Sequence, residues 1–448
     1  MPALHGGAAS REGLWKQMLL FFLPLLFGTF FQQLYNTVDA VIVGQFVGKE
    51  ALAAVGGSSA AIINLLVGFF MGLSNGATVI IAQSYGAGDR QNVSRAVHTG
   101  MALSIAAGAA LTLTGALFGG AALRMMGTPQ DVYDGSRVYL TIYFCGMVPN
   151  LVYNIGAGIL RAVGDSKRPL YFLIITCFAN IFLDLLFVAV LHWGVAGVAA
   201  ATILSQAISA AMVILTLTRS REVYHLELRS IRFHGKTLKR IVSIGIPSGI
   251  QSAMYAISNL LIQSSVNSFG TDTVAAWTAF GKLDTLYWMG SGSFGIAVST
   301  FAGQSYGAGH YDRMRSAVRS GFVMNAIYAA TLSTAMFFGA QYALRLFLED
   351  ETVIGYGITM SRFISTAYLL FIPIELLAAV CRSAGDTLRP TVMTAVGICG
   401  FRTLWLFTAL SIWHTRQMLY VSYPLSWAIT SVLFILYYRK GTWLRKHQ

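Results

Sequence analysis

Two motifs in this chain each occur twice, and the two copies of each are the same distance apart. The hexapeptide QSYGAG at residues 83–88 recurs at 304–309, and the pattern RxxGDxxRP at 161–169 recurs at 382–390, so each offset is 221 residues. One repeated hexapeptide can arise by chance, whereas two motifs at one offset require that the chain between them kept its length. The sequence therefore predicts a duplicated unit.

The composition is that of an integral membrane protein. Hydrophobic residues make up 55% of the chain and charged residues only 11%, with a mean hydropathy of +0.62; soluble domains carry about 25% charged residues. The 45 glycines are typical of membrane helices whose backbones pack closely. The four cysteines lie in apolar stretches without paired spacing, which predicts free thiols and no metal site.

The net charge of +13 does not indicate a nucleic-acid partner. The basic residues are scattered among the predicted connections and form no stripe interleaved with aromatic residues. The first apolar stretch, at residues 14–47, is longer than a signal-peptide core, so we expect it to be a retained span in a lipid bilayer.

Twelve apolar stretches are long enough to cross the hydrocarbon core, which takes roughly 20 residues each. They lie at about residues 16–45, 51–82, 93–119, 133–160, 168–190, 195–218, 238–268, 273–302, 314–340, 353–381, 389–412 and 416–438. Because six is even, each half begins and ends on the same side of the membrane, and the repeats are parallel. We expect an all-α protein with an N-lobe at 1–218, a linker at 219–236 and a C-lobe with a basic tail at 237–448.

The placement of basic residues predicts the orientation. Most of the 31 Lys and Arg residues lie at the termini and in the even-numbered connections, which places both termini in the cytoplasm. The repeated motifs then lie at the cytoplasmic ends of the spans. We expect residues 86–88 to form a tight turn, and Arg161 to form an ion pair with Asp165 in the loop.

Polar residues inside the first span are the first candidates for a functional role, since such groups are costly in hydrocarbon. Gln32, Tyr35, Asn36 and Asp39 follow one another at spacings of three and four, which places them on one helical face. That face must contact protein or water rather than lipid. Asp39 is therefore the leading candidate for a proton- or cation-binding carboxylate.

The fifth predicted span supplies a second polar pair, Asn180 and Asp184, one turn apart. Burial and a neighbouring like charge both disfavour the ionised form of a carboxyl group, so a carboxyl group of this kind can carry a proton. Its occupancy can then bias one conformation over another. Asn154 and Thr202 are candidates for the same network with Asp39; a fixed hydrogen-bonded brace between helices is the alternative for all five residues.

The second half differs in its chemistry. It keeps an asparagine, Asn259, but Ile262 stands where the first half has its carboxylate. Lys282, Asp284 and Glu375 are its buried charges, and we expect Lys282 to pair with Glu375, as an ion pair or as part of a substrate or coupling site.

A wider set of residues forms the predicted substrate cavity. It comprises Gln32, Tyr35, Asn36, Tyr255, Asn259, Lys282, Asp284, Met289 and Glu375. Aromatic and methionine residues in membrane helices more often serve packing. Arg362 and Arg402 lie near span ends, where we expect them to extend toward the interface.

Several enzymatic motifs are absent from the sequence. There is no Walker A loop, which argues against ATP as the energy source, and no HExxH or clustered histidines. We expect a secondary transporter without an organic cofactor, driven by H⁺ or Na⁺. The alternative is an integral membrane enzyme acting on lipid intermediates.

The segments at 33–44 (QLYNTVDAVIVG) and 48–56 (GKEALAAVG), with the two QSYGAG turns and the two RxxGD loops, resemble prokaryotic members of the multidrug and toxic compound extrusion (MATE) family. The resemblance implies a V-shaped pair of six-helix lobes that exports amphipathic, often cationic compounds in exchange for protons or sodium. It also implies that Asp39 is the coupling carboxylate, with Asn180, Asp184, Asn154 and Thr202 around it and Na⁺ possible at Asp39, Asn180 and Asp184.

This sequence departs from the sodium-linked branch of that family, because its seventh span, residues 241–266, carries no carboxylate. Coupling in the N-lobe is therefore favoured, and we expect a functional monomer. The alternatives within transport are a lipid-linked oligosaccharide flippase of the same superfamily and a major-facilitator transporter.

Overall fold

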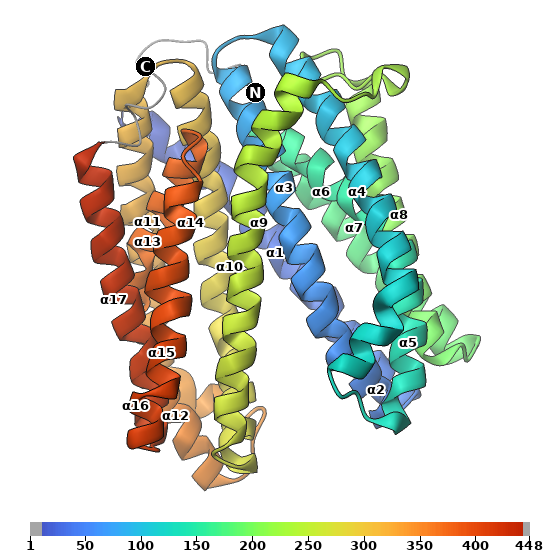
Figure 1. Cartoon of the computed structure of the whole chain (residues 1–448), viewed down its shortest axis with the longest axis vertical. Coiled ribbons are helices and arrows are strands. Elements are labelled where there is room, and N and C mark those ends of the chain that lie inside the picture. Colours follow the sequence, from blue (N-terminus) through green and yellow to red (C-terminus); the bar gives the residue numbers. More distant parts are fainter. Residues whose placement is uncertain (1–10, 442–448) are drawn as a thin grey trace. The chain divides into compact units, whose positions relative to one another are not determined.

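The computed structural model describes residues 11–441, which are helical with short connections and contain no strand (Figure 1). The first half comprises α1 (Arg11–Phe46), α2 (Lys49–Gly56), α3 (Ser58–Gly86), α4 (Arg90–Met125), α5 (Gln130–Cys145), α6 (Met147–Ala162), α7 (Lys167–Asp184), the π-helix η1 (Leu185–Val190) and α8 (Gly194–Arg219). A short 3₁₀ turn, η2 (Leu228–Ser230), lies in the connection that follows.

The second half repeats this order. It comprises α9 (Gly235–Asn267), α10 (Thr271–Gly307), α11 (Tyr311–Leu344), α12 (Glu351–Ser365), α13 (Tyr368–Ser383), α14 (Leu388–Thr394), the π-helix η3 (Ala395–Gly400), α15 (Phe401–Phe407), α16 (Ala409–Ile412) and α17 (Arg416–Lys440). The start of α14 lies 221 residues after the start of α7, as the repeated motifs require.

The helices match the predicted spans. Nine helical segments of the described chain are long and apolar enough to cross a membrane. Two bent pairs, α5 with α6 and α12 with α13, each form one further span with a bend of 50° or 49°. The remaining predicted span is α10, which is 37 residues long but less apolar than the others.

The described residues pack as two compact units. The N-unit contains residues 23–253, and the C-unit contains residues up to Phe22 together with those from Met254 onward. The chain thus passes from one unit to the other within α1 and within α9. This division follows packing, whereas the predicted lobes follow the sequence repeat, so the lobe boundaries stay a prediction.

The core of the N-unit is built from small and β-branched side chains. Ile80 of α3, Val97 of α4, Leu160 of α6 and Val213 of α8 are almost fully buried in one cluster. Closely packed helices of this kind leave little room for movement of a side chain. A second buried cluster includes Ile42 of α1 and Val188 of η1, the π-helix that follows α7.

Both QSYGAG segments form turns, as predicted. Gly88 and Gly309 have φ values of +70° and +72°, a left-handed conformation that glycine adopts without steric cost. In the first copy, the Asp89 carboxylate then accepts the N–H of Asn92 and caps α4. The motif therefore forms a tight turn that joins two long helices.

The predicted ion pair of Arg161 with Asp165 is wrong. Asp165 instead pairs with Arg168, at 3.3 Å, and accepts the backbone N–H groups of Lys167 and Arg168. The second copy repeats this arrangement with Asp386 and Arg389. The partners are three positions apart, so one carboxylate can both cap the helix and bind the arginine.

Candidate functional site

Two buried carboxyl groups meet in the N-unit. Asp39 of α1 is 8% exposed, and Asp184, the last residue of α7, is fully buried. The two carboxyl groups lie close enough to act on each other electrostatically. Residues 145 positions apart in the chain therefore lie in one acidic cluster, and both belong to the network that the sequence predicted around Asp39.

The polar side chains of the cluster lack hydrogen-bond partners. Oδ1 of Asp39, both carboxyl oxygens of Asp184 and both amide atoms of Asn180 are buried without a hydrogen-bond partner among the described residues. Buried polar atoms are nearly always paired, so each exception needs an explanation. A proton or a hard cation between the carboxyl groups would supply a partner for these oxygens, since carboxylate and amide oxygens suit both.

The local helix geometry contributes to the position of Asp184. Asn180 and Asp184 lie one turn apart on α7, and the π-helix η1 begins at the next residue. Single π turns occur mostly where a helix carries a functional group. The end of α7 thus presents both side chains toward the same buried space.

Asn154 and Thr202 are not hydrogen-bonded to the carboxyl groups. Asn154 Nδ2 donates to the carbonyl oxygen and side chain of Asn150 in its own helix, at 2.9 and 3.1 Å. Thr202 Oγ1 donates to the Val198 carbonyl oxygen, at 3.0 Å. Their roles in the network stay a prediction, since both side chains must first leave these intrahelical bonds.

Three polar residues near the cluster were missed by the sequence analysis. Tyr139 and Tyr143 of α5 lie within electrostatic reach of Asp39, and Gln206 of α8 lies beside the Tyr143 hydroxyl. The Oε1 atom of Gln206 is also buried without a partner. A signal was available, because Tyr139 and Tyr143 are four residues apart on α5.

The other predicted residues of α1 divide between interior and surface. Tyr35 lies one turn before Asp39, half-buried and close to Tyr143. Gln32 and Asn36 are exposed. The four residues thus share one broad face of α1, as their spacing predicted. Only Tyr35 and Asp39 on that face reach the acidic cluster.

In the C-unit, Asp284 of α10 is the best-satisfied of the predicted charges. Its carboxylate accepts the Tyr368 hydroxyl and the Trp288 indole N–H, both at 2.6 Å. Tyr368 stacks on Tyr287 with ring centres 3.8 Å apart. These contacts hold Asp284 in a fixed position.

The expected pair of Lys282 with Glu375 does not form in the described structure, which has no ion pair for either residue. Lys282 is exposed, whereas the Glu375 carboxyl group packs against Gly295 and lies near Arg382 and Tyr255. Residues on neighbouring helices meet only when both side chains point toward the shared contact. Lys282 lies on an exposed face of α10, whereas the Glu375 carboxyl group lies against Gly295.

The remaining cavity candidates and the two arginines are placed as follows. Asn259 is exposed, Tyr255 is half-buried and Met289 is 9% exposed. Arg362 is exposed and packs on Phe337, in agreement with a position at the interface. Arg402 is 4% exposed, so its expected extension toward the interface is wrong.

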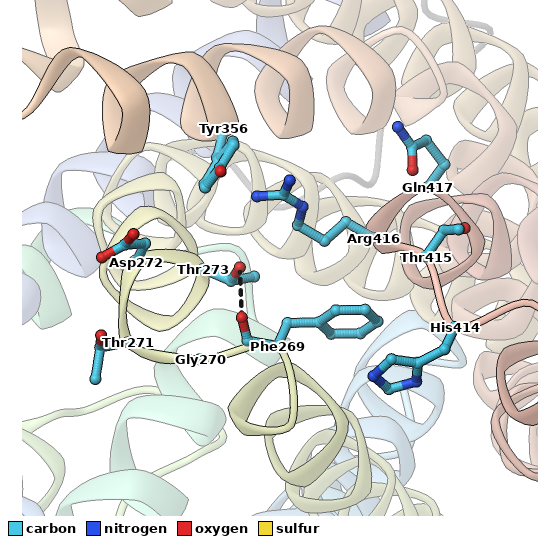
Figure 2. A pocket seen from close by; sticks show the side chains of 10 residues that line it. All are labelled: Phe269, Gly270, Thr271, Asp272, Thr273, Tyr356, His414, Thr415, Arg416 and Gln417. Carbon is cyan, nitrogen blue, oxygen red and sulfur yellow. Dashed lines mark hydrogen bonds between the residues drawn. The ribbon is translucent and has the colours of Figure 1, made fainter.

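A pocket of about 510 Å³ lies elsewhere in the C-unit, between the α9–α10 turn, α12 and the start of α17 (Figure 2). The Arg416 guanidinium lies 3.5 Å from the centre of the Tyr356 ring, and Phe269 stacks on His414. None of the lining residues is among the predicted site residues. The pocket is thus separate from the acidic cluster and from Asp284.

The fold, the duplication and the buried carboxyl pair define a polytopic membrane transporter. The MatE family model matches the chain twice, at residues 24–186 and 247–407, and so covers both halves. The chain belongs to the MatE family of multidrug efflux transporters, and it is a transporter rather than an enzyme.

Curated relatives are similar along nearly the whole chain. The "Probable multidrug resistance protein YoeA" of Bacillus subtilis is 30% identical over 448 residues, which cover 98% of this chain and 96% of that protein. The "Probable multidrug resistance protein NorM" of Thermotoga maritima is 23% identical, covering 96% and 93%. Both are similar proteins whose names refer to drug resistance.

Solved structures show the same fold. A MOP superfamily transporter from Pyrococcus furiosus has a TM-score of 0.88 at 23% identity, with 97% of each chain covered. An outward-facing multidrug resistance MATE family transporter has a TM-score of 0.88 at 22% identity, also with 97% of each chain covered. The predicted all-α fold of twelve membrane helices is therefore confirmed.

Proposed function

We propose that this chain is a secondary multidrug antiporter of the cell membrane, with both termini in the cytoplasm. It exports amphipathic, often cationic compounds and takes up protons in exchange. The coupling proton binds between Asp39 and Asp184, with Asn180 beside them. The chain acts as a monomer in the bilayer and uses neither ATP nor an organic cofactor.

The observation that carries this proposal is the set of buried, unpartnered oxygens around Asp39, Asp184 and Asn180. Two adjacent carboxylates in a low-dielectric environment repel each other, and a shared proton removes the repulsion and supplies a donor. The empty and the occupied cluster thus differ strongly in free energy. A difference of this kind is what a coupled transporter needs to favour one conformation over another.

Sodium is the competing ion, because the same carboxylate and amide oxygens can hold a small cation. The purified protein in liposomes separates the two. A pH gradient and a sodium gradient are imposed one at a time, and export of a cationic dye is followed by fluorescence. We expect the pH gradient alone to drive export.

Each other outcome of that assay has a definite meaning. Export driven only by the sodium gradient would replace the proton with sodium and keep the site. Export driven by neither gradient would overturn the antiport proposal. Scrambling of a labelled lipid without dye movement would favour a flippase.

A further inference from the structure

Arg402 is a buried charge without a counter-ion in direct contact. Its Nε donates to Ser426 Oγ at 2.9 Å, but one terminal NH₂ group is buried and unpartnered. No Asp or Glu oxygen of the described residues lies within ion-pair distance of Arg402. A buried guanidinium in this state is costly, so its presence requires a reason.

The face of α17 that holds Arg402 is the repeat counterpart of the α8 face at the N-unit cluster. The guanidinium carbon lies 4.0 Å from the centre of the Tyr423 ring and 5.7 Å from that of Trp427. These two residues lie 221 positions after Thr202 and Gln206. Ser426, the hydrogen-bond partner of Arg402, has the same relation to a serine of α8.

The π-helices explain how an arginine reaches this position. The helix after the RxxGD loop begins at equivalent residues in both halves, but η3 (Ala395–Gly400) comes much earlier along it than η1 (Leu185–Val190) does. A π turn contains one residue more than an α-helical turn, because its hydrogen bonds join residues five rather than four positions apart. Residues just after η3 are therefore shifted by one relative to α7, so that Arg402 takes the place of Asn180 and Leu406 that of Asp184.

The same place thus has opposite charge in the two units. The N-unit has two carboxyl groups and an amide there. In the C-unit, Leu406 and Ile262 stand at the positions of the two carboxyl groups, and Arg402 stands at the position of the amide. We propose that the Arg402 guanidinium is a built-in cation of the C-unit. It occupies the position at which the N-unit binds an exchangeable cation. The C-unit then binds no coupling ion.

Asp284 is the counter-charge of this built-in cation. Its carboxylate accepts the N–H of Trp288, whose ring lies edge-on to that of Trp427 with ring centres 6.1 Å apart, and Trp427 lies beside the Arg402 guanidinium. Asp284 thus acts electrostatically on Arg402, as do the titratable groups Tyr423, Tyr255 and Cys399. Glu375 faces Arg382 and Tyr255 instead. The two charges are not in direct contact but balance each other, with Arg402 held by Ser426 and Asp284 held by Tyr368 and Trp288.

Proton binding to the purified full-length protein tests this pairing without any transport. Potentiometric titration from about pH 5 to about pH 9 compares wild type, Arg402→Gln, Arg402→Lys and the double variant Arg402→Gln/Asp284→Asn. We expect Arg402→Gln to bind about one more proton at neutral pH than wild type does, because Asp284 has lost its counter-charge. Arg402→Lys keeps the charge and should titrate as wild type does.

The double variant removes both buried charges and should not take up the extra proton. If Arg402→Gln alone does not fold, the double variant should fold again, since it leaves no uncompensated charge. Arg362→Gln, at an exposed arginine, is the matched control. The proposal would be overturned if folded Arg402→Gln bound no extra proton, or if Arg402→Lys bound one. It would also be overturned if the double variant bound the extra proton or failed to fold.

The inference that the C-unit binds no coupling ion rests on the proposed antiport function. The titration of Arg402 variants does not depend on that function. With a fixed cation in the C-unit, one exchangeable site serves each transport cycle. A failure of dye export would therefore leave the Arg402 and Asp284 pairing intact, and a failed titration would leave coupling at Asp39 intact.

Discussion

Gly72 of α3 and Gly249 of α9 lie so close together that a Cβ atom on Gly72 would overlap the backbone of Gly249. Gly76 meets the backbone of Gly245 in the same way, one turn along each helix. Small residues at this spacing let membrane helices approach closely. The contact joins the first element of the second repeat to the core of the N-unit.

Gly72→Ala should therefore destabilise the N-unit. An added methyl group at a backbone contact forces the helices apart, at a cost of about 1–3 kcal/mol. The thermal stability of the detergent-solubilised protein measures this. Gly292→Ala is the control, because a Cβ at Gly292 in α10 meets nothing within 4 Å; equal loss in both variants would refute the packing argument.

Removal of the α4 cap should give a pH-dependent loss of stability. The N–H of Asn92 donates to the Asp89 carboxylate, and this holds the pKa of Asp89 below its ordinary value. A depressed pKa stabilises the fold above the unfolded value, about 4, and this contribution is lost as the pH falls through the folded value. Asp89→Ala should lower the melting temperature at neutral pH, with a smaller difference from wild type in acid.

The repeat supplies controls for this cap. Asp89→Asn keeps an acceptor for the helix N–H groups and should lose less than alanine does. His310 occupies the same place before α11 and makes no side-chain cap, so His310→Ala should have no effect. A pH-independent loss in Asp89→Ala would contradict a role for the ionised carboxylate.

Tyr368→Phe should destabilise the C-unit, because Asp284 then loses one of its two donors. Leaving a buried acceptor unsatisfied costs about 1–3 kcal/mol. Tyr420→Phe is a suitable control, as the Tyr420 hydroxyl has no hydrogen bond within the described residues. Thermal unfolding of both variants provides the comparison, and equal stability of Tyr368→Phe and wild type would show that Trp288 alone suffices for Asp284.

The sequence predicted the fold well because its two signals each constrain the chain: apolar stretches of this length cross the bilayer, and a repeat at one offset indicates two halves with the same fold. Twelve apolar stretches and two motifs at one offset allow few arrangements other than two similar bundles. The packing units were less predictable. The division of α1 near Phe22 and of α9 near Ala253 depends on contacts between distant residues, which no local pattern reports.

For the candidate site, the sequence identified Asp39, Asp184 and Asn180 but not their surroundings. Helical spacing shows which residues share a face of one helix, and it does not show that Tyr143 of α5 approaches Asp39. The burial of Arg402 was hidden for a sharper reason. A π turn shifts every later residue around the helix axis, so counting from the repeated motif misplaces Arg402 by one position.

If Asp39 and Asp184 share the coupling proton, as proposed, a variant that lacks either carboxyl group should no longer couple export to the pH gradient. Asp39→Asn, Asp184→Asn and the exposed control Asp272→Asn are placed in liposomes, and dye export is measured with and without a pH gradient. We expect Asp39→Asn and Asp184→Asn to fold and bind dye but to lose at least about tenfold of gradient-driven export, while Asp272→Asn stays as wild type. Normal gradient-driven export in folded Asp39→Asn would exclude Asp39 from the coupling site.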